Sequence, residues 1–195
     1  MKNVKLQLID LLIEKKISII SINKLMGVGK IIVVKKNTKL IAVGDVCDKG
    51  FYVLDGAFIS RIFNVQTGNS GTQNFFLPDF NQFMSCEDSY FTGEKTNTDL
   101  IAVKDSTVIQ FLKSDFEQLF LTNHELASFF HNHIIVNALR QESEFRKILN
   151  AYSKEEIYKY LIEFCNPIVK NIPSKYIAEF MGISAEWLSK TKKNI

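Results

Sequence analysis

Between Gly29 and Lys113 the chain is divided into seven short runs rich in Val, Ile, Leu, Phe and Tyr, separated by turn signals such as Asp55-Gly56. β-Branched and aromatic residues favour extended strands, and runs this short do not favour helices. Many short strands with turns between them are typical of a β-sandwich or barrel. The runs are Ile31–Val34, Leu40–Val43, Phe51–Leu54, Phe58–Phe63, Gln73–Leu77, Leu100–Val103 and Val108–Leu112.

Both flanks of this β-region have helical spacing. Residues 4–26 place apolar side chains among charges, which predicts one or two amphipathic helices. Ser114-Asp-Phe-Glu117 matches a capping box and predicts a helix start, and Tyr152-Ser-Lys-Glu-Glu156 ends one helix and caps the next. The chain is therefore expected to be α+β, with three parts at residues 1–122, 123–150 and 151–195.

The helix expected around residues 124–149 has the spacing of a coiled-coil seam. Such a seam packs against a partner helix and favours a homodimer joined along it. The alternative is packing against the β-region of the same chain, because Phe129, Phe130, Ile135 and Leu139 widen the apolar face enough for two surfaces. The seam residues are Ala127, His131, Ile134, Ala138, Gln141, Phe145 and Ile148.

The segment 172–193 has the pattern of a helix-turn-helix. Apolar residues at helical spacing precede Gly182, which suits the tight turn, and Ser184 is a natural N-cap for a second helix that carries Trp187 and Leu188 inward. The outward face of that second helix would meet the major groove of DNA. The residues predicted to contact DNA are Lys175, Ser184, Glu186, Ser189, Lys190, Lys192 and Lys193.

Charge is concentrated at the same end. The chain has a net charge of +3, and residues 168–195 contain five lysines and two glutamates, which accounts for all of it. A basic patch attracts phosphate without sequence preference, so this end is the expected electrostatic footprint of a nucleic acid. A solvated terminal helix is the alternative, since lysines also suit a helix C-terminus.

Other functions find little support in the sequence. The three cysteines (47, 86 and 165) are scattered, which argues against a disulfide framework or a cysteine metal site, and all three histidines lie outside the β-region. We find no catalytic triad, phosphate loop, haem pattern, signal peptide or membrane span. We expect a cytoplasmic protein with no enzymatic activity, no metal and no cofactor.

The order of a β-barrel, one long helix and a terminal helix-turn-helix resembles the Crp/Fnr family of bacterial transcription regulators. Ala42-Val-Gly-Asp45 and Phe51-Tyr-Val-Leu-Asp-Gly56 look like the start of the family's cyclic-nucleotide-binding-type barrel, a double-stranded β-helix or jelly roll. Pro173–Lys190 looks like the helix-turn-helix of short members, which end soon after the recognition helix without a wing. The resemblance implies a homodimeric DNA-binding regulator that binds a palindromic site.

The cassette segment, residues 77–99, departs from the family members that bind cyclic AMP. Thr96 and Asn97 stand where those members have an Arg-Ser pair, and Lys95 is a point charge that cannot replace the guanidinium fork. The resemblance therefore implies a different small-molecule effector, or none. Its expected contacts are Phe83, Met84, Ser85, Cys86, Thr96, Asn97 and Thr98.

A second function remains open at this point. Family recognition helices usually have arginine at the positions of Ala185 and Lys190, so the barrel here is alternatively a ligand-sensing or protein-interaction module whose helix-turn-helix no longer binds DNA. Glu186 matches a base-reading glutamate of the family and favours DNA binding over this alternative.

Overall fold

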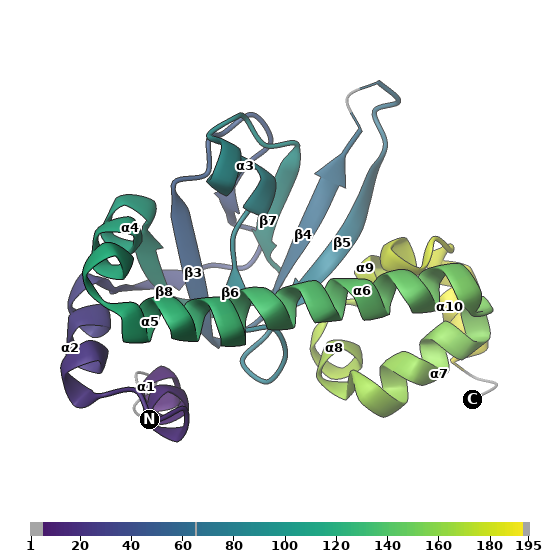
Figure 1. Ribbon diagram of the computed structural model, residues 1–195. Helices are drawn as coiled ribbons and strands as arrows, with labels where there is room; N and C mark the ends of the chain where they lie inside the picture. The colour runs from purple at the N-terminus through teal and green to yellow at the C-terminus, as the bar shows by residue number, and fades with distance from the viewer. Residues whose placement is uncertain (1–5, 65, 193–195) are drawn as a thin grey trace.

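The computed structural model describes residues 6–64 and 66–192, in which the strands form two four-stranded antiparallel sheets (Figure 1). Sheet A has the strand order β1-β8-β3-β6 and sheet B the order β2-β7-β4-β5. Each of the seven expected runs contributes to a strand, and β6 is an additional one. The strands are β1 (Lys30–Val34), β2 (Lys39–Ile41), β3 (Lys49–Asp55), β4 (Phe58–Phe63), β5 (Ser70–Phe76), β6 (Phe83–Met84), β7 (Thr98–Ala102) and β8 (Ser106–Leu112).

The two sheets face each other across one apolar core to which all eight strands contribute. Phe51 and Val53 of β3 point into this core, while Tyr52 and Leu54 point to the outer side of sheet A, and all four are buried. Strands with two buried faces are apolar at every position instead of alternating, which explains the continuous run at 51–54. The mixed α+β class is confirmed, but the described strands form two separate sheets rather than one closed barrel.

Helices from both ends of the β-region cover the outer face of sheet A. The carboxylate of Glu125 accepts hydrogen bonds from the backbone N–H and hydroxyl of Ser18 and from the hydroxyl of Ser21, and so joins the second helix to the long helix. The helices are α1 (Leu6–Glu14), α2 (Ile19–Val28), α4 (Lys113–Thr122) and α5 (His124–Phe129). A short helix, α3 (Glu87–Thr92), lies above the sheets (Figure 1).

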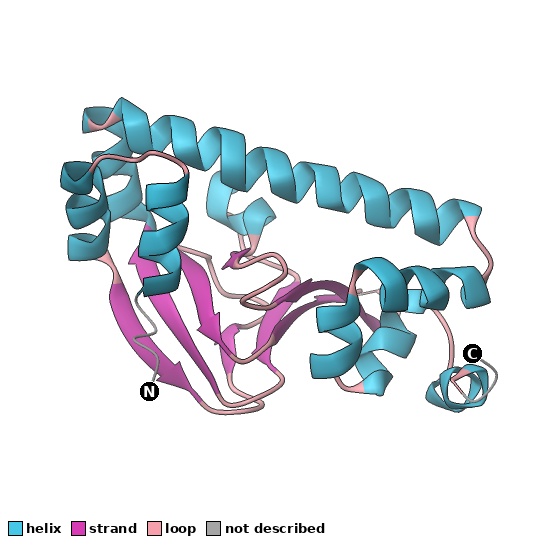
Figure 2. Cartoon of the chain, turned by 90° about the horizontal axis from the view of Figure 1, so that it is seen from below, coloured by secondary structure: helices cyan, strands magenta, loops and turns pink. Residues whose placement is uncertain are grey.

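A long helix runs past the sheets and connects the two ends of the molecule (Figure 2). It is built from α5, a wide π-helical turn η1 (Phe130–Ile135) and α6 (Val136–Ala151). The expected capping box at Ser114–Glu117 is wrong, because α4 begins at Lys113 after Leu112, and Asn123 supplies the side-chain cap of α5 instead. Ser153 and Glu156 do form the expected capping box.

The C-terminal helices cover the outer face of sheet B. One apolar core contains side chains of β4, β5 and β7 together with side chains of α6 and of all four C-terminal helices. The C-terminal helices and sheet B therefore share a single core. The helices are α7 (Lys154–Phe164), α8 (Asn166–Asn171), α9 (Ser174–Met181) and α10 (Ala185–Thr191). No helix in the described part of the chain is long and apolar enough to cross a bilayer.

Gly56 occupies the tight turn between β3 and β4, and replacing it should destabilise the fold. Its φ is +91°, and a Cβ at this position would lie 2.0 Å from Ser106 Oγ and 2.7 Å from Ser106 Cα. Because the backbone strain and the clash with another strand add, Gly56→Ala should reduce the free energy of unfolding by about 3 kcal/mol or more in urea titrations.

Gly44→Ala is the matched control. Gly44 has nearly the same φ, +94°, but a Cβ there would meet nothing within 4 Å. This variant should lose only the strain, about 1–2 kcal/mol. Equal losses for the two variants would show that Ser106 does not make the β3–β4 turn dependent on glycine.

Candidate nucleic-acid interface

The predicted helix-turn-helix is present as α9, a tight turn and α10. Gly182 ends α9 in the left-handed region with φ of 66°, and its N–H donates to the carbonyls of Ala178 and Glu179. The hydroxyl of Ser184 accepts a hydrogen bond from the N–H of Trp187 at 3.1 Å and caps α10. The residue types that predicted the turn and the cap therefore have the expected conformations.

The inward side of the two helices is well packed. Ile177, Met181 and Leu188 are fully buried, and small Ala178 lies in the same core. Trp187, expected inward with Leu188, is only half-buried. A fixed inward side determines which residues of α10 face solvent.

The outward side of α10 is exposed to solvent and carries three polar side chains beside Ala185. Ala185, Glu186, Ser189 and Lys190 are all exposed. Hydrogen bonds from its own backbone N–H and from Ser184 lower the pKa of Glu186. Glu186 is therefore an ionised acceptor at neutral pH, the form that accepts a hydrogen bond from the amino group of cytosine.

The described lysines of the C-terminal end are exposed, and two of them contact other side chains. The ammonium of Lys175 lies 4.5 Å from the ring centroid of Tyr176. Lys192 donates to the hydroxyl of Ser174 at 2.6 Å and so joins the end of α10 to the start of α9. Lys193, also expected to contact phosphate, lies outside the described residues.

The cassette segment does not bring the seven expected effector residues together. Met84, Cys86, Thr96 and Thr98 are buried, and Met84 and Cys86 lie in the core between the sheets. The ring of Phe83 points to the other side of β6, 5.2 Å from the ring of Phe130, and Ser85 donates to the carbonyl of Lys49. Asn97 is exposed.

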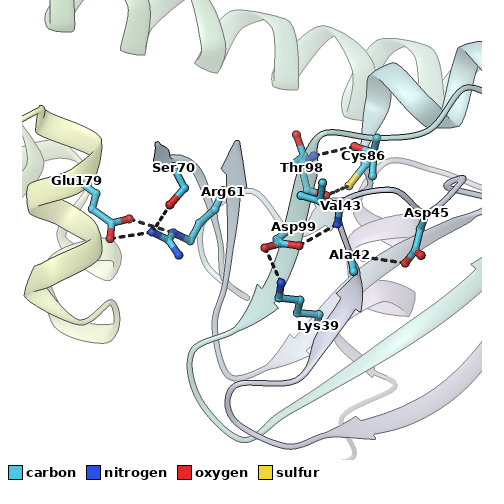
Figure 3. Close-up of polar contacts among 11 residues, drawn as sticks. Lys39, Ala42, Val43, Asp45, Arg61, Ser70, Cys86, Thr98, Asp99 and Glu179 are labelled. Carbon is cyan, nitrogen blue, oxygen red and sulfur yellow. Dashed lines mark hydrogen bonds and ion pairs between the residues drawn. The ribbon is translucent and has the colours of Figure 1, made fainter. Parts of the chain in front are cut away.

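Two buried thiols contact each other at this position. A hydrogen bond from the thiol of Cys86 lowers the pKa of Cys47 to about 6, and the same contact together with burial raises the pKa of Cys86. The sulfur of Cys86 also lies 3.7 Å from the carbonyl oxygen of Thr98 (Figure 3). Both cysteines lie in the core between the two sheets.

The carboxylates near the cassette segment hold the neighbouring loop in place. Asp99 accepts from the N–H of Val43 at 2.9 Å and pairs with Lys39 at 2.8 Å, and Asp45 accepts from the N–H of Ala42 (Figure 3). Among the described residues, no group of three or more His, Cys, Asp and Glu is arranged to bind a metal ion.

The seam residues of the long helix differ in how far they are buried. Phe145 and Ile148 are buried in the core shared with sheet B, and Phe145 packs on Phe80 and Phe180, so these two seam residues pack within their own chain. Ile134 and Ala127 are partly buried. His131 and Ala138 are exposed and Gln141 is half-buried.

Sequence reasoning missed that the first helix of the helix-turn-helix is bound to sheet B. Glu179 of α9 contacts Arg61 of β4 and Thr72 of β5, which are 118 and 107 residues away in the sequence. In the sequence Arg61 is a residue of the run Phe58–Phe63, and Glu179 is one of the two glutamates of residues 168–195. No local pattern relates the two positions.

Comparisons with known proteins show which solved structures have a similar fold. Neither a protein-family model nor a curated protein matches the sequence. Among solved structures, FixK2 from Bradyrhizobium japonicum superposes with a TM-score of 0.71 at 16% identity, covering 86% of this chain and 84% of that one. CLP, a c-di-GMP-responsive global regulator from Xanthomonas campestris, has a TM-score of 0.62 at 12% identity, with 91% of each chain covered.

A third solved structure has a similar fold. CooA from Carboxydothermus hydrogenoformans, in a mutant form, has a TM-score of 0.64 at 10% identity and covers 87% of this chain and 77% of that one. These proteins are Crp/Fnr family regulators. The chain therefore has the fold of the Crp/Fnr regulators, as the resemblance in the sequence predicted.

Proposed function

We propose that this chain is a DNA-binding transcription regulator of the Crp/Fnr type. The observation that carries the proposal is the outward face of α10, which is exposed and polar while the opposite side of the helix is fixed in a buried core. A helix held in this way is what a helix-turn-helix inserts into the major groove. Such a protein acts where DNA is, which is the cytoplasm of a bacterial cell.

The residues divide into two roles. Glu186, Ser189 and Lys190 read bases from the first turns of α10, and Ser184 lies at its N-terminal end. Lys175, at the start of α9, and Lys192 contact phosphate, because the first helix of this motif crosses the DNA backbone. Lys193 is assigned to phosphate on its sequence position alone.

The protein functions as a homodimer joined along the long helix. Its large exposed apolar residues are Ile135 and Leu139, which lie four positions apart and are 40% and 61% exposed. Ala138 beside them is also exposed. Two-fold symmetry would place two recognition helices about 34 Å apart on a palindromic site.

The sensor sheets do not bind cyclic AMP in the usual way. Thr96, at the position of the family's phosphate-binding arginine, is buried and hydrogen-bonded to the N–H of Thr98. Any effector is a small molecule of another kind that contacts the cassette segment.

The DNA contacts are tested by fluorescence anisotropy with a duplex selected from a random-sequence library by the wild-type protein. Glu186→Ala should weaken binding to the selected duplex by about 1–3 kcal/mol and leave binding to random DNA unchanged. Lys175→Ala should weaken both duplexes alike and reduce the slope of log K against log salt by about one.

Lys24→Ala is the charge-matched control, because Lys24 is exposed on α2 at the opposite end of the molecule (Figure 1). It should change neither affinity nor salt slope. Equal losses on both duplexes for Glu186→Ala would contradict base reading. A selection with the wild-type protein that enriches no sequence, together with no binding to random DNA, would favour the module with an inactive helix-turn-helix.

The dimer is tested by light scattering at tens of micromolar. Leu139→Glu should convert the dimer to a monomer, since it places two charges in an apolar two-fold contact. Leu121→Glu is the control, because Leu121 is 79% exposed but lies on α4. A monomeric wild type, or a Leu139→Glu variant that stays dimeric, would show that this face is not the interface.

Calorimetric titration with cyclic AMP and cyclic GMP should give no saturable heat at micromolar concentrations. A cyclic phosphate buried without its guanidinium partner costs about 3–5 kcal/mol, or two to four decades of affinity. A micromolar dissociation constant for either nucleotide would refute the interpretation of the cassette segment.

A further inference from the structure

The carboxylate of Glu179, on α9, is held by three donors from sheet B. Figure 3 shows the two from Arg61. Arg61 donates from Nε to Oε2 and from a terminal nitrogen to Oε1, both at 3.1 Å, which makes the contact bidentate. The hydroxyl of Thr72 donates to Oε2 at 2.8 Å. Bidentate contacts of this kind fix direction as well as distance.

The guanidinium itself is oriented by the sheet. Its terminal nitrogen donates to the hydroxyl of Ser70 at 2.9 Å, and its carbon lies 5.8 Å from the ring centroid of Tyr176. The Arg61 and Glu179 side chains are 25% and 29% exposed, whereas the Arg146–Glu142 pair on α6 is 71% and 55% exposed. Exposed pairs contribute little to stability, so the partly buried pair is the one that constrains the structure.

An aromatic contact lies beside the ion pair. The ring of Phe180 packs edge-on against Phe75 of β5 at 5.0 Å and against Phe145 of α6 at 4.9 Å. All three rings are buried. Neighbouring residues of α9 thus bind it to sheet B and to the long helix at once.

This attachment leaves the outward face of α10 free. Glu186, Ser189 and Lys190 are exposed while α9 is attached, so the attached arrangement is compatible with DNA contact. Because α6 belongs to the proposed dimer interface, fixing α9 to the sheet and to α6 also fixes the two recognition helices relative to each other.

We propose that Arg61 of the sensor sheet is a positioning residue for DNA recognition, which holds α9 and therefore α10 in the DNA-binding orientation without an effector. The inference rests on the proposed function. A pre-organised orientation lowers the ordering cost of binding both half-sites together, so it favours the palindromic site over random DNA.

The test compares the ratio of affinities for the selected and the random duplex. Arg61→Ala and Glu179→Ala should each lower this ratio by about tenfold, and the double variant should be no worse than either, because both remove one contact. Arg61→Lys, which keeps the charge but not the fork, should recover only part of the ratio. Lys24→Ala, an exposed cation on α2, should leave it unchanged.

Hydrogen exchange supplies a readout without DNA. Arg61→Ala should speed exchange across residues 174–181, and Arg146→Ala should not. An unchanged affinity ratio for Arg61→Ala, or losses that add in the double variant, would overturn the positioning role. A selection with the wild-type protein that enriches no sequence, together with no binding to random DNA, would instead overturn the proposed function, and the role of Arg61 in recognition with it. Glu179→Gln, which retains side-chain shape, gives the same comparison if an alanine variant fails to fold.

Discussion

Burial of both outer faces of the β-sandwich is the constraint on which the rest of the structure depends. Strands that are apolar at every position, such as Phe51–Leu54, leave two outer faces that water cannot cover favourably. Helices from the N-terminal end cover sheet A, and the helix-turn-helix region covers sheet B. The element proposed to bind DNA is therefore also a structural layer of the sensor.

This arrangement separates the two sides of the helix-turn-helix by chemistry. Apolar side chains such as Ile177 and Leu188 fix the motif in the shared core, and polar residues of α10 remain exposed. The turn itself needs little more than Gly182 and the Ser184 cap. Orientation comes from elsewhere, through α9, which contacts sheet B and the long helix at Glu179 and Phe180.

Local signals in the sequence were sufficient for every strand except β6, for the capping box at Ser153 and for the α9–α10 turn, since each depends on neighbouring residues. The spacing from Ala127 to Ile148 crosses η1, a wide turn at Phe130–Ile135, so residues before and after this turn do not share one helical periodicity. The partners of Phe145 and Glu179 could not be predicted, because they lie on elements far away in the sequence.

The shared core also limits how this chain can diverge or be recombined. A helix-turn-helix transplanted from another regulator would have to supply an apolar side chain that packs on Phe75 and Phe145, as Phe180 does, and a carboxylate for Arg61. Otherwise it would leave sheet B exposed to solvent. Residues on the outward face of α10 are not constrained by these packing contacts. Substitutions on this face can therefore change the DNA sequence that is recognised without disturbing the fold. The contacts between α9 and sheet B would stay the same.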